Sequence, residues 1–172
     1  MVLDVKRAFL YGQARRPIYL KLPKEDPCSA GGKLVGRLER SLYGTRDAPQ
    51  IWQEELKETM EAIGYRGCAS HPGVYYHPAS GAMAVAHVDD VLAIGPKSQL
   101  QNLQSQLQKK YELKHEILGP DPDEAKEVEF LGRSIKWTAT GLEYQAGQKH
   151  IQTLVEDWNM QQCRAVGSPS TA

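Results

Sequence analysis

The chain has 172 residues with 21 basic and 21 acidic side chains, so its formal net charge is zero. This length fits one domain, and a mean hydropathy of −0.51 is ordinary for a soluble globular protein. No apolar run approaches the roughly 20 residues of a membrane span, and residues 1–7 lack the apolar segment of a secretory signal. We therefore expect no membrane partner.

Three widely spaced cysteines, Cys28, Cys68 and Cys163, indicate a reducing compartment and no disulfide framework, so we expect an intracellular location, either cytoplasm or nucleus. The neutral total conceals an asymmetry, because residues 1–50 carry ten basic and five acidic side chains. This net of +5 could follow phosphates, although an unevenly charged solvated surface is the simpler interpretation of charge alone.

The first half of the chain predicts short strands at residues 1–4, 18–22 and 34–38, with a turn-rich loop at 26–32. A helix is expected after Pro49, because apolar residues then recur with a 3.6-residue period until Gly64. These apolar residues are Ile51, Trp52, Leu56, Met60 and Ile63.

The second half predicts strands at 74–76, 82–88 and 91–94, then a helix capped by Ser98 with Leu100, Leu103, Leu107 and Tyr111 on one face. A strand at 111–117 and an acidic loop at 120–124 follow. Two paired strands, 128–137 and 142–144, are joined at Thr140 and Gly141. A last helix carries the stripe Ile151, Leu154, Val155 and Trp158. The pattern favours an α+β fold, an antiparallel sheet covered by helices on one face.

Two adjacent acids, Asp89 and Asp90, lie between two apolar strand-like runs. Side chains alternate along a strand, so both can face one site only where the chain turns sharply, as at a hairpin tip. Such a tip could hold Mg²⁺, which prefers carboxylates, water and substrate phosphates, although a solvated turn is the commoner role of such a pair. Asp4 ends the first strand-like run and on its own is most simply a helix N-cap.

Residues 3–12, 41–52 and 88–90 resemble three motifs of copia-type retrotransposon reverse transcriptases, in the same order and at similar spacing. Further resemblances are found at residues 18–23, 73–76 and 130–135, so the similarity covers about residues 2 to 169. It implies a polymerase palm over residues 1–166, with the start of a thumb at about 147–160 and a frayed tail at 167–172.

The resemblance implies that Asp4, Asp89 and Asp90 are catalytic residues that hold two Mg²⁺ ions, for which Mn²⁺ could substitute. Asp4 and Asp89 are the preferred main ligands, because adjacent residues cannot both have equivalent geometry. The implied function is transfer of deoxynucleotides to a primer 3′-hydroxyl on an RNA or DNA template.

Phe9 matches an aromatic beneath the incoming sugar, where a ring would exclude a 2′-hydroxyl, although a core Phe is equally compatible with its neighbours. Tyr43, Gly44 and Arg46 match the loop that contacts the nucleotide. The implied primer and template contacts are Trp52 and the hairpin residues Phe130, Leu131 and Gly132. For Trp52, a place in the core is the stronger expectation.

Two departures from the family pattern concern this region. His87 stands where the family usually has Tyr, and Asp47 puts a negative charge beside the implied nucleotide pocket. Asp4 is the fourth residue of this sequence, whereas the resemblance implies a fingers region before this motif and an RNase H domain after the palm. These parts of the parent polyprotein would be partners of the palm. We therefore expect little or no processive synthesis from this chain alone.

Two alternatives to the polymerase interpretation remain open on sequence grounds. One is a catalytically inactive palm remnant that at most binds nucleic acid through residues 1–50, and another is an unrelated Mg²⁺ phosphotransfer site. Cys68, His71 and His77 superficially suggest a zinc site, but a second Cys pair is lacking. The acidic loop at 120–124 lacks the Gly and terminal Glu of a calcium loop.

Overall fold

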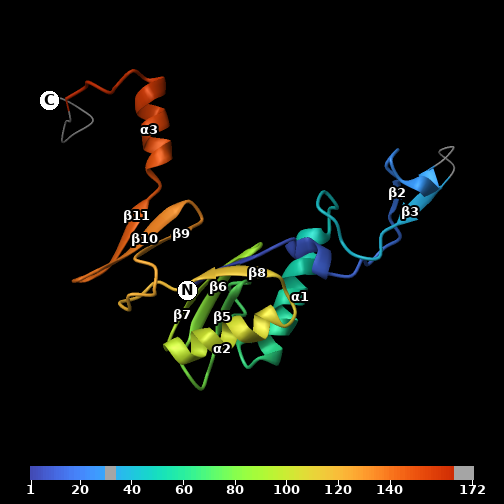
Figure 1. Ribbon diagram of the computed structural model, residues 1–172, viewed down its shortest axis with the longest axis horizontal. Helices are drawn as coiled ribbons and strands as arrows, with labels where there is room; N and C mark the ends of the chain where they lie inside the picture. Colours follow the sequence, from blue (N-terminus) through green and yellow to red (C-terminus); the bar gives the residue numbers. More distant parts are fainter. Residues whose placement is uncertain (30–33, 165–172) are drawn as a thin grey trace.

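A six-stranded antiparallel sheet forms the centre of the computed structural model, which describes residues 1–29 and 34–164 (Figure 1). In spatial order its strands are β4 (Arg66–Gly67), β5 (Val74–Tyr76), β6 (Met83–His87), β7 (Asp90–Ile94), β1 (Val2–Val5) and β8 (Leu113–Glu116). Helices α1 (Ala48–Ala62) and α2 (Lys97–Gln108) cover one face of this sheet, as predicted.

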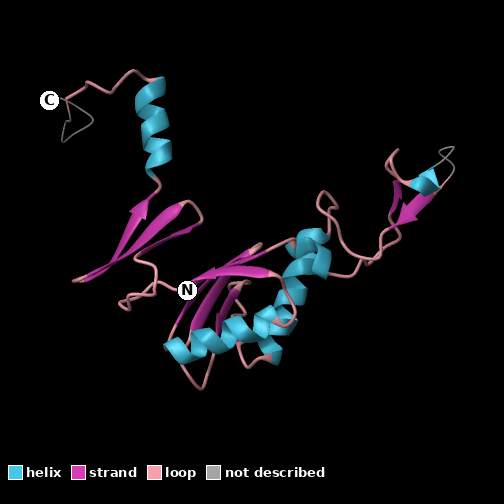
Figure 2. Ribbon diagram, in the orientation of Figure 1, coloured by secondary structure: helices cyan, strands magenta, loops and turns pink. Residues whose placement is uncertain are grey.

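Two smaller groups of elements project from this central body (Figure 2). One contains the hairpin of β2 (Tyr19–Lys21) and β3 (Val35–Arg37), with the 3-10 helix η2 (Pro27–Ser29) between its strands. The other contains the sheet of β9 (Glu127–Phe130), β10 (Arg133–Thr138) and β11 (Gly141–Ala146), followed by α3 (Gln148–Asp157). The 3-10 helix η1 (Ala8–Tyr11) belongs to the central body, where Ala8 is fully buried in the core. None of the described helices is long and apolar enough to cross a membrane.

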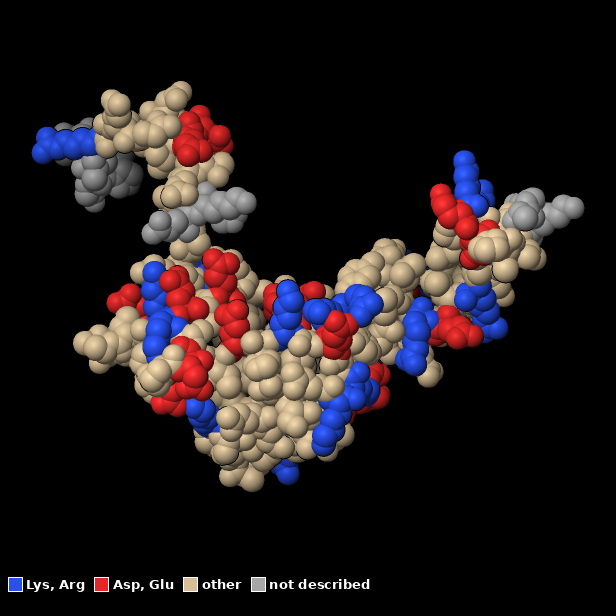
Figure 3. Space-filling model, in the orientation of Figure 1, with Lys and Arg blue, Asp and Glu red and all other residues tan. Residues whose placement is uncertain are grey.

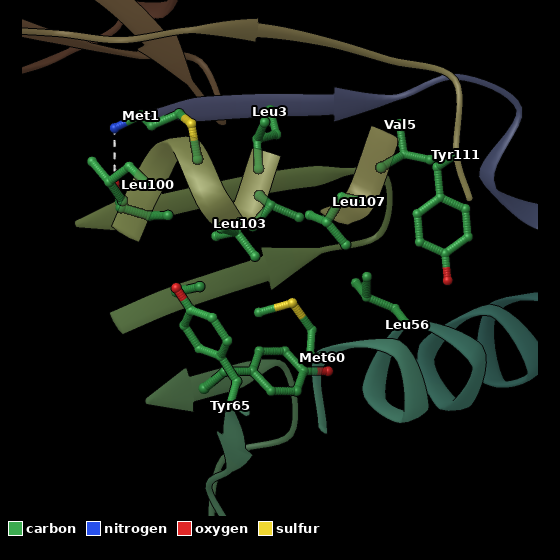
Figure 4. Packing of buried hydrophobic residues seen from close by; sticks show 14 of the residues in the cluster. Met1, Leu3, Val5, Leu56, Met60, Tyr65, Leu100, Leu103, Leu107 and Tyr111 are labelled. Carbon is green, nitrogen blue, oxygen red and sulfur yellow. Dashed lines mark hydrogen bonds between the residues drawn. The ribbon is translucent and has the colours of Figure 1, made fainter. Parts of the chain in front are cut away.

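The hydrophobic core lies between the central sheet and its two helices (Figure 4). Alternate residues of β1, Leu3 and Val5, are fully buried, and Leu103 and Leu107 of α2 pack in the same cluster. Burying each such side chain stabilises the fold by about 1.5–3 kcal/mol. Because side chains alternate along β1, Val2 and Asp4 face the side of the sheet away from the helices.

The structure corrects several local predictions. Asp4 lies inside β1 and caps no helix, since η1 follows Arg7, whose φ of 56° separates it from the strand. Helix α2 begins at Lys97 after Pro96, so Ser98 is within the helix and not its cap. The predicted strand 128–137 is divided into β9 and β10 by Leu131 and Gly132. Strand β4 was not predicted from the sequence.

The loop predicted at 26–32 lies partly outside the described residues, and the tail predicted at 167–172 lies entirely outside them. The domain boundary at residue 166 also remains a prediction. Helix α3 lies where the last helix was expected, and the assignment of this region to the start of a thumb remains a prediction.

Candidate active site

Asp4 and Asp90 are direct cross-strand neighbours. The antiparallel register of β1 and β7 places Asp4 opposite Asp90, with Leu3 opposite Val91 and Val2 opposite Leu92. Val91 and Ala93 are buried toward the helices, so the alternation of β7 turns Asp90 to the other face, the face of Asp4. Cross-strand neighbours have Cβ atoms about 4.5–5.5 Å apart. The two carboxylates therefore share one place on the open side of the sheet.

Asp89 lies in the tight turn between β6 and β7, which confirms the predicted hairpin tip. His87 pairs with Asp90, so only Val88 and Asp89 form the loop. Val88 has a φ of 55°, in the left-handed region that β-branched residues avoid. The Asp89 carbonyl accepts a hydrogen bond from the Val5 amide, with N and O 2.9 Å apart. Both acid-bearing elements are thus joined at the tip.

An open cavity of about 680 Å³ surrounds the carboxylates of Asp4 and Asp90. Its other lining residues come from β1, β8 and β9: Val2, Lys114, His115, Glu116, Glu127, Val128 and Glu129. The register puts Lys114 directly opposite Asp4. Sequence reasoning missed Lys114, because its place beside Asp4 depends on the pairing of β8 with β1, which no local pattern indicates.

The surroundings of Asp90 disfavour the ionised form of its carboxyl group. Partial burial raises the pKa of Asp90 above its ordinary value, the charges of Asp89 and Asp4 raise it further, and His87 acts in the opposite direction. A bound cation would relieve this repulsion and favour the ionised carboxylates. The donor chemistry suits a hard divalent ion, because carboxylate oxygens are the protein ligands that Mg²⁺ prefers.

The structure brings together two of the three predicted ligands more closely than the third. Asp4 and Asp90 line the cavity, whereas Asp89 does not. Within residues 1–29 and 34–164, no three His, Cys, Asp or Glu side chains converge closely enough to form a metal site. The geometry therefore favours Asp90 as the partner of Asp4, and the sequence-based preference for Asp89 remains a prediction.

The predicted nucleotide-binding residues adjoin the end of β1. Phe9 is partly buried against the core, and its ring packs on the half-exposed ring of Tyr43 with centroids 4.5 Å apart. The Ser41 hydroxyl donates to the Phe9 carbonyl and so joins the two segments. Gly44 has a φ of 90°, which a side chain would strain, and Arg46 is exposed.

Asp47 does not present an isolated negative charge to this region. Arg16 donates to it, with Nε and Oδ2 3.2 Å apart, and this hydrogen bond lowers the pKa of the Asp47 carboxyl. Arg15 similarly pairs with Glu54, and Lys6 and Arg7 both pair with Glu112. Four of the ten basic side chains of residues 1–50 therefore have acidic partners. Charged side chains of both signs occur together along the rim of the body (Figure 3).

Trp52 and the predicted primer hairpin occupy contrasting positions. Trp52 is only 2% exposed, which agrees with the core placement and leaves no ring face for a template base. Leu131 and Gly132 form the two-residue turn between β9 and β10, both with positive φ, as in a type I′ hairpin. Leu131 is about half exposed, while Phe130 is partly buried. Strand β9 also walls the cavity around Asp4.

Comparison with known proteins agrees with this arrangement. The model of the family described as reverse transcriptase (RNA-dependent DNA polymerase) matches residues 1–172. The chain belongs to the reverse transcriptase family. It is 31% identical, over 97% of its length, to the retrovirus-related Pol polyprotein from transposon TNT 1-94 of Nicotiana tabacum. It is 28% identical, again over 97% of its length, to that from transposon RE1 of Arabidopsis thaliana.

These relatives place the reverse transcriptase chain in the copia-type group, which confirms the resemblance seen in its motifs. The chain spans 12% of the tobacco polyprotein and 11% of the Arabidopsis one. A transposon Ty5-1 protein of Saccharomyces cerevisiae is 30% identical over 81% of this chain, which covers 44% of that protein. The palm-like sheet with helices on one face is the expected fold.

Proposed function

We propose that this chain is the catalytic palm of an RNA-directed DNA polymerase, with Asp4 and Asp90 as the principal metal-binding carboxylates and Asp89 as the third acid. The observation that carries the proposal is the direct opposition of Asp4 and Asp90 on one face of the sheet, within a single cavity. Two carboxylates are placed side by side at a cost unless a cation compensates them. A bound Mg²⁺ would offset this unfavourable repulsion.

Divalent cations bound between these carboxylates would lower the pKa of a primer 3′-hydroxyl and neutralise charge on the triphosphate and the leaving pyrophosphate. Asp4 and Asp90 would hold the ions, or Mn²⁺ in their place. The ammonium group of Lys114, opposite Asp4, would add positive charge where a polyphosphate must lie.

Phe9 and Tyr43 would form the floor beneath the nucleotide sugar. Their ring contact fixes Phe9 at one place beside the end of β1, which is the condition for excluding a 2′-hydroxyl by shape. Replacing Phe9 by Val should then admit ribonucleotides. Continued rejection of ribonucleotides by a folded Phe9→Val protein would show that Phe9 is only a packing residue.

The RNA or DNA partner would contact the basic surface formed by residues 13–17 and 37–40. Arg15, Arg16, Arg37 and Arg40 line one cavity of about 490 Å³ there, with Glu39 as an acidic neighbour. The bridge between Gln13 and Arg40 holds the two segments together. Since Arg15 and Arg16 already have acidic partners, binding should be weak. Because it depends on contacts between basic side chains and phosphates, added salt should weaken it further.

Incorporation of a single deoxynucleotide into a primed RNA or DNA template, in Mg²⁺ and in Mn²⁺, tests this function. Wild type should extend the primer, and Asp4→Asn and Asp90→Asn should abolish extension. Asp123→Asn is the matched control, because Asp123 is exposed in a loop outside the cavity. No extension by wild type, with salt-sensitive nucleic-acid binding retained, would instead support the inactive remnant.

A further inference from the structure

The backbone of the acid-bearing turn is hydrogen-bonded to a buried side chain of α1. The indole Nε1–H of Trp52 donates to the carbonyl oxygen of Val88, with N and O 2.5 Å apart. Val88 directly precedes Asp89 and Asp90, whereas Trp52 is 36 residues away in the sequence. The core helix thus contacts the tip of the hairpin through one directed polar bond.

The orientation of the indole is determined by its surroundings. Trp52 follows the helical spacing of Leu56 and Met60, so these three side chains pack into the core from one face of α1. The ring of Tyr111 packs edge-on against the indole with centroids 5.2 Å apart, and Tyr11 lies on another side at 6.2 Å. With its ring enclosed, Trp52 can direct its N–H toward few acceptors.

A buried indole N–H is costly to leave unpaired, which makes the Val88 carbonyl a required partner. The turn also needs support, because Val88 adopts a left-handed conformation that is unfavourable for a β-branched residue. The second turn residue is held from β1, where the Val5 amide donates to the Asp89 carbonyl. The two carbonyls of the turn are therefore held from two directions, by α1 and by β1.

We propose that Trp52 is a positioning residue for the active site: its Nε1–H fixes the Val88 carbonyl and so keeps the following acids in register with Asp4. This inference rests on the proposed polymerase function, but its structural part concerns cation binding alone. Because Trp52 is only 2% exposed, it has no open ring face for a substrate. It acts through the peptide backbone of the turn, and loss of its N–H leaves the core packing intact.

The sharpest test replaces Trp52 by 3-benzothienylalanine, in which sulfur takes the place of the Nε1–H group while ring size is retained. We expect kcat for single-nucleotide incorporation to fall about tenfold, the equivalent of one hydrogen bond, with little change in the nucleotide KM. The Mn²⁺ affinity, measured by water proton relaxation, should fall as well. The urea midpoint serves as the check on folding.

The matched control is the same replacement at Trp137, an indole of the β9–β11 sheet that is 38% exposed. It should change neither kcat nor Mn²⁺ affinity. A second variant weakens the acceptor instead of the donor: a backbone ester at the bond between Val88 and Asp89 makes the Val88 carbonyl a poorer acceptor. It should reproduce the loss seen with the Trp52 analogue.

Unchanged incorporation and unchanged Mn²⁺ affinity in a folded Trp52 analogue would overturn the proposal and make Trp52 a packing residue only. The two hypotheses fail separately. If wild type binds Mn²⁺ but never extends a primer, the polymerase function fails. A lowered Mn²⁺ affinity in both the analogue and the ester variant would then still support the positioning role.

Discussion

Helices α2 and α3 both show an apolar stripe in the sequence, yet only one stripe is buried. Leu100, Leu103 and Leu107 of α2 are at most 7% exposed, because the central sheet covers them. On α3, Ile151 and Leu154 are 57% and 59% exposed. Leu142 and Tyr144 of the neighbouring β11 are also largely exposed.

This difference shows what amphipathic spacing does and does not predict. The 3.6-residue period correctly predicts a helix in both places, since either stripe suits a packed interface. It does not tell whether the covering surface belongs to the same chain. The central body should therefore determine the stability of the fold, and the β9–β11 sheet with α3 should contribute little.

The largest contrast is expected between Leu103→Ala and Leu154→Ala. The first deletes a fully buried side chain and should lower the free energy of unfolding by about 2–5 kcal/mol. The second trims an exposed side chain and should change it by no more than about 0.5 kcal/mol. Urea unfolding of both variants measures this directly. Equal losses would mean that α3 belongs to the cooperative core.

A smaller contrast is expected between two glycines with positive φ. At Gly73, with φ of 90°, an added Cβ would lie 2.7 Å from the backbone oxygen of Ala86, so Gly73→Ala must shift the β5–β6 pairing. At Gly132, with φ of 70°, the space is open, and Gly132→Ala costs only the left-handed conformation, about 1–2 kcal/mol. Thermal unfolding should show the larger loss for Gly73→Ala.

In the absence of metal, the stability of the central body should depend on pH through the pair Asp4 and Asp90. The pKa of Asp90 is raised above its ordinary value of 3.8, so the folded state binds this proton more tightly than the unfolded state. Stability from this group is present at low pH and falls as pH rises from about 3.8 through the folded pKa. Asp90→Asn should lack that decrease in Tm, while Asp123→Asn should retain it.

The smallest effect concerns thiol reactivity. Hydrogen bonds from Ser70 and from the amides of Ser70 and His71 lower the pKa of Cys68 to about 7. Alkylation of Cys68 by iodoacetamide, followed by mass spectrometry, should therefore show a midpoint near pH 7. Ser70→Ala should move it upward. A midpoint near the ordinary thiol value of about 8.5 would contradict this environment.

Much of the fold could be predicted from local patterns, and the acid-bearing turn could be placed because Asp89 and Asp90 divide two apolar runs. The pairing of Asp4 with Asp90 could not be predicted from the sequence, because strand register depends on contacts between residues far apart in the chain. The position of Lys114 beside Asp4 could not be predicted for the same reason. The indole bond to Val88 is likewise a tertiary feature, which the helical spacing of Trp52 does not reveal.

The central claim is that Asp4 and Asp90 form one cation-binding unit, and a double-mutant cycle of Mn²⁺ affinity tests it most directly. Wild type, Asp4→Asn, Asp90→Asn and the double variant are compared by water proton relaxation. Each single replacement should remove most of the affinity, and the second should add little once the first is made. Independent, additive losses, or no Mn²⁺ binding by wild type, would contradict the shared site.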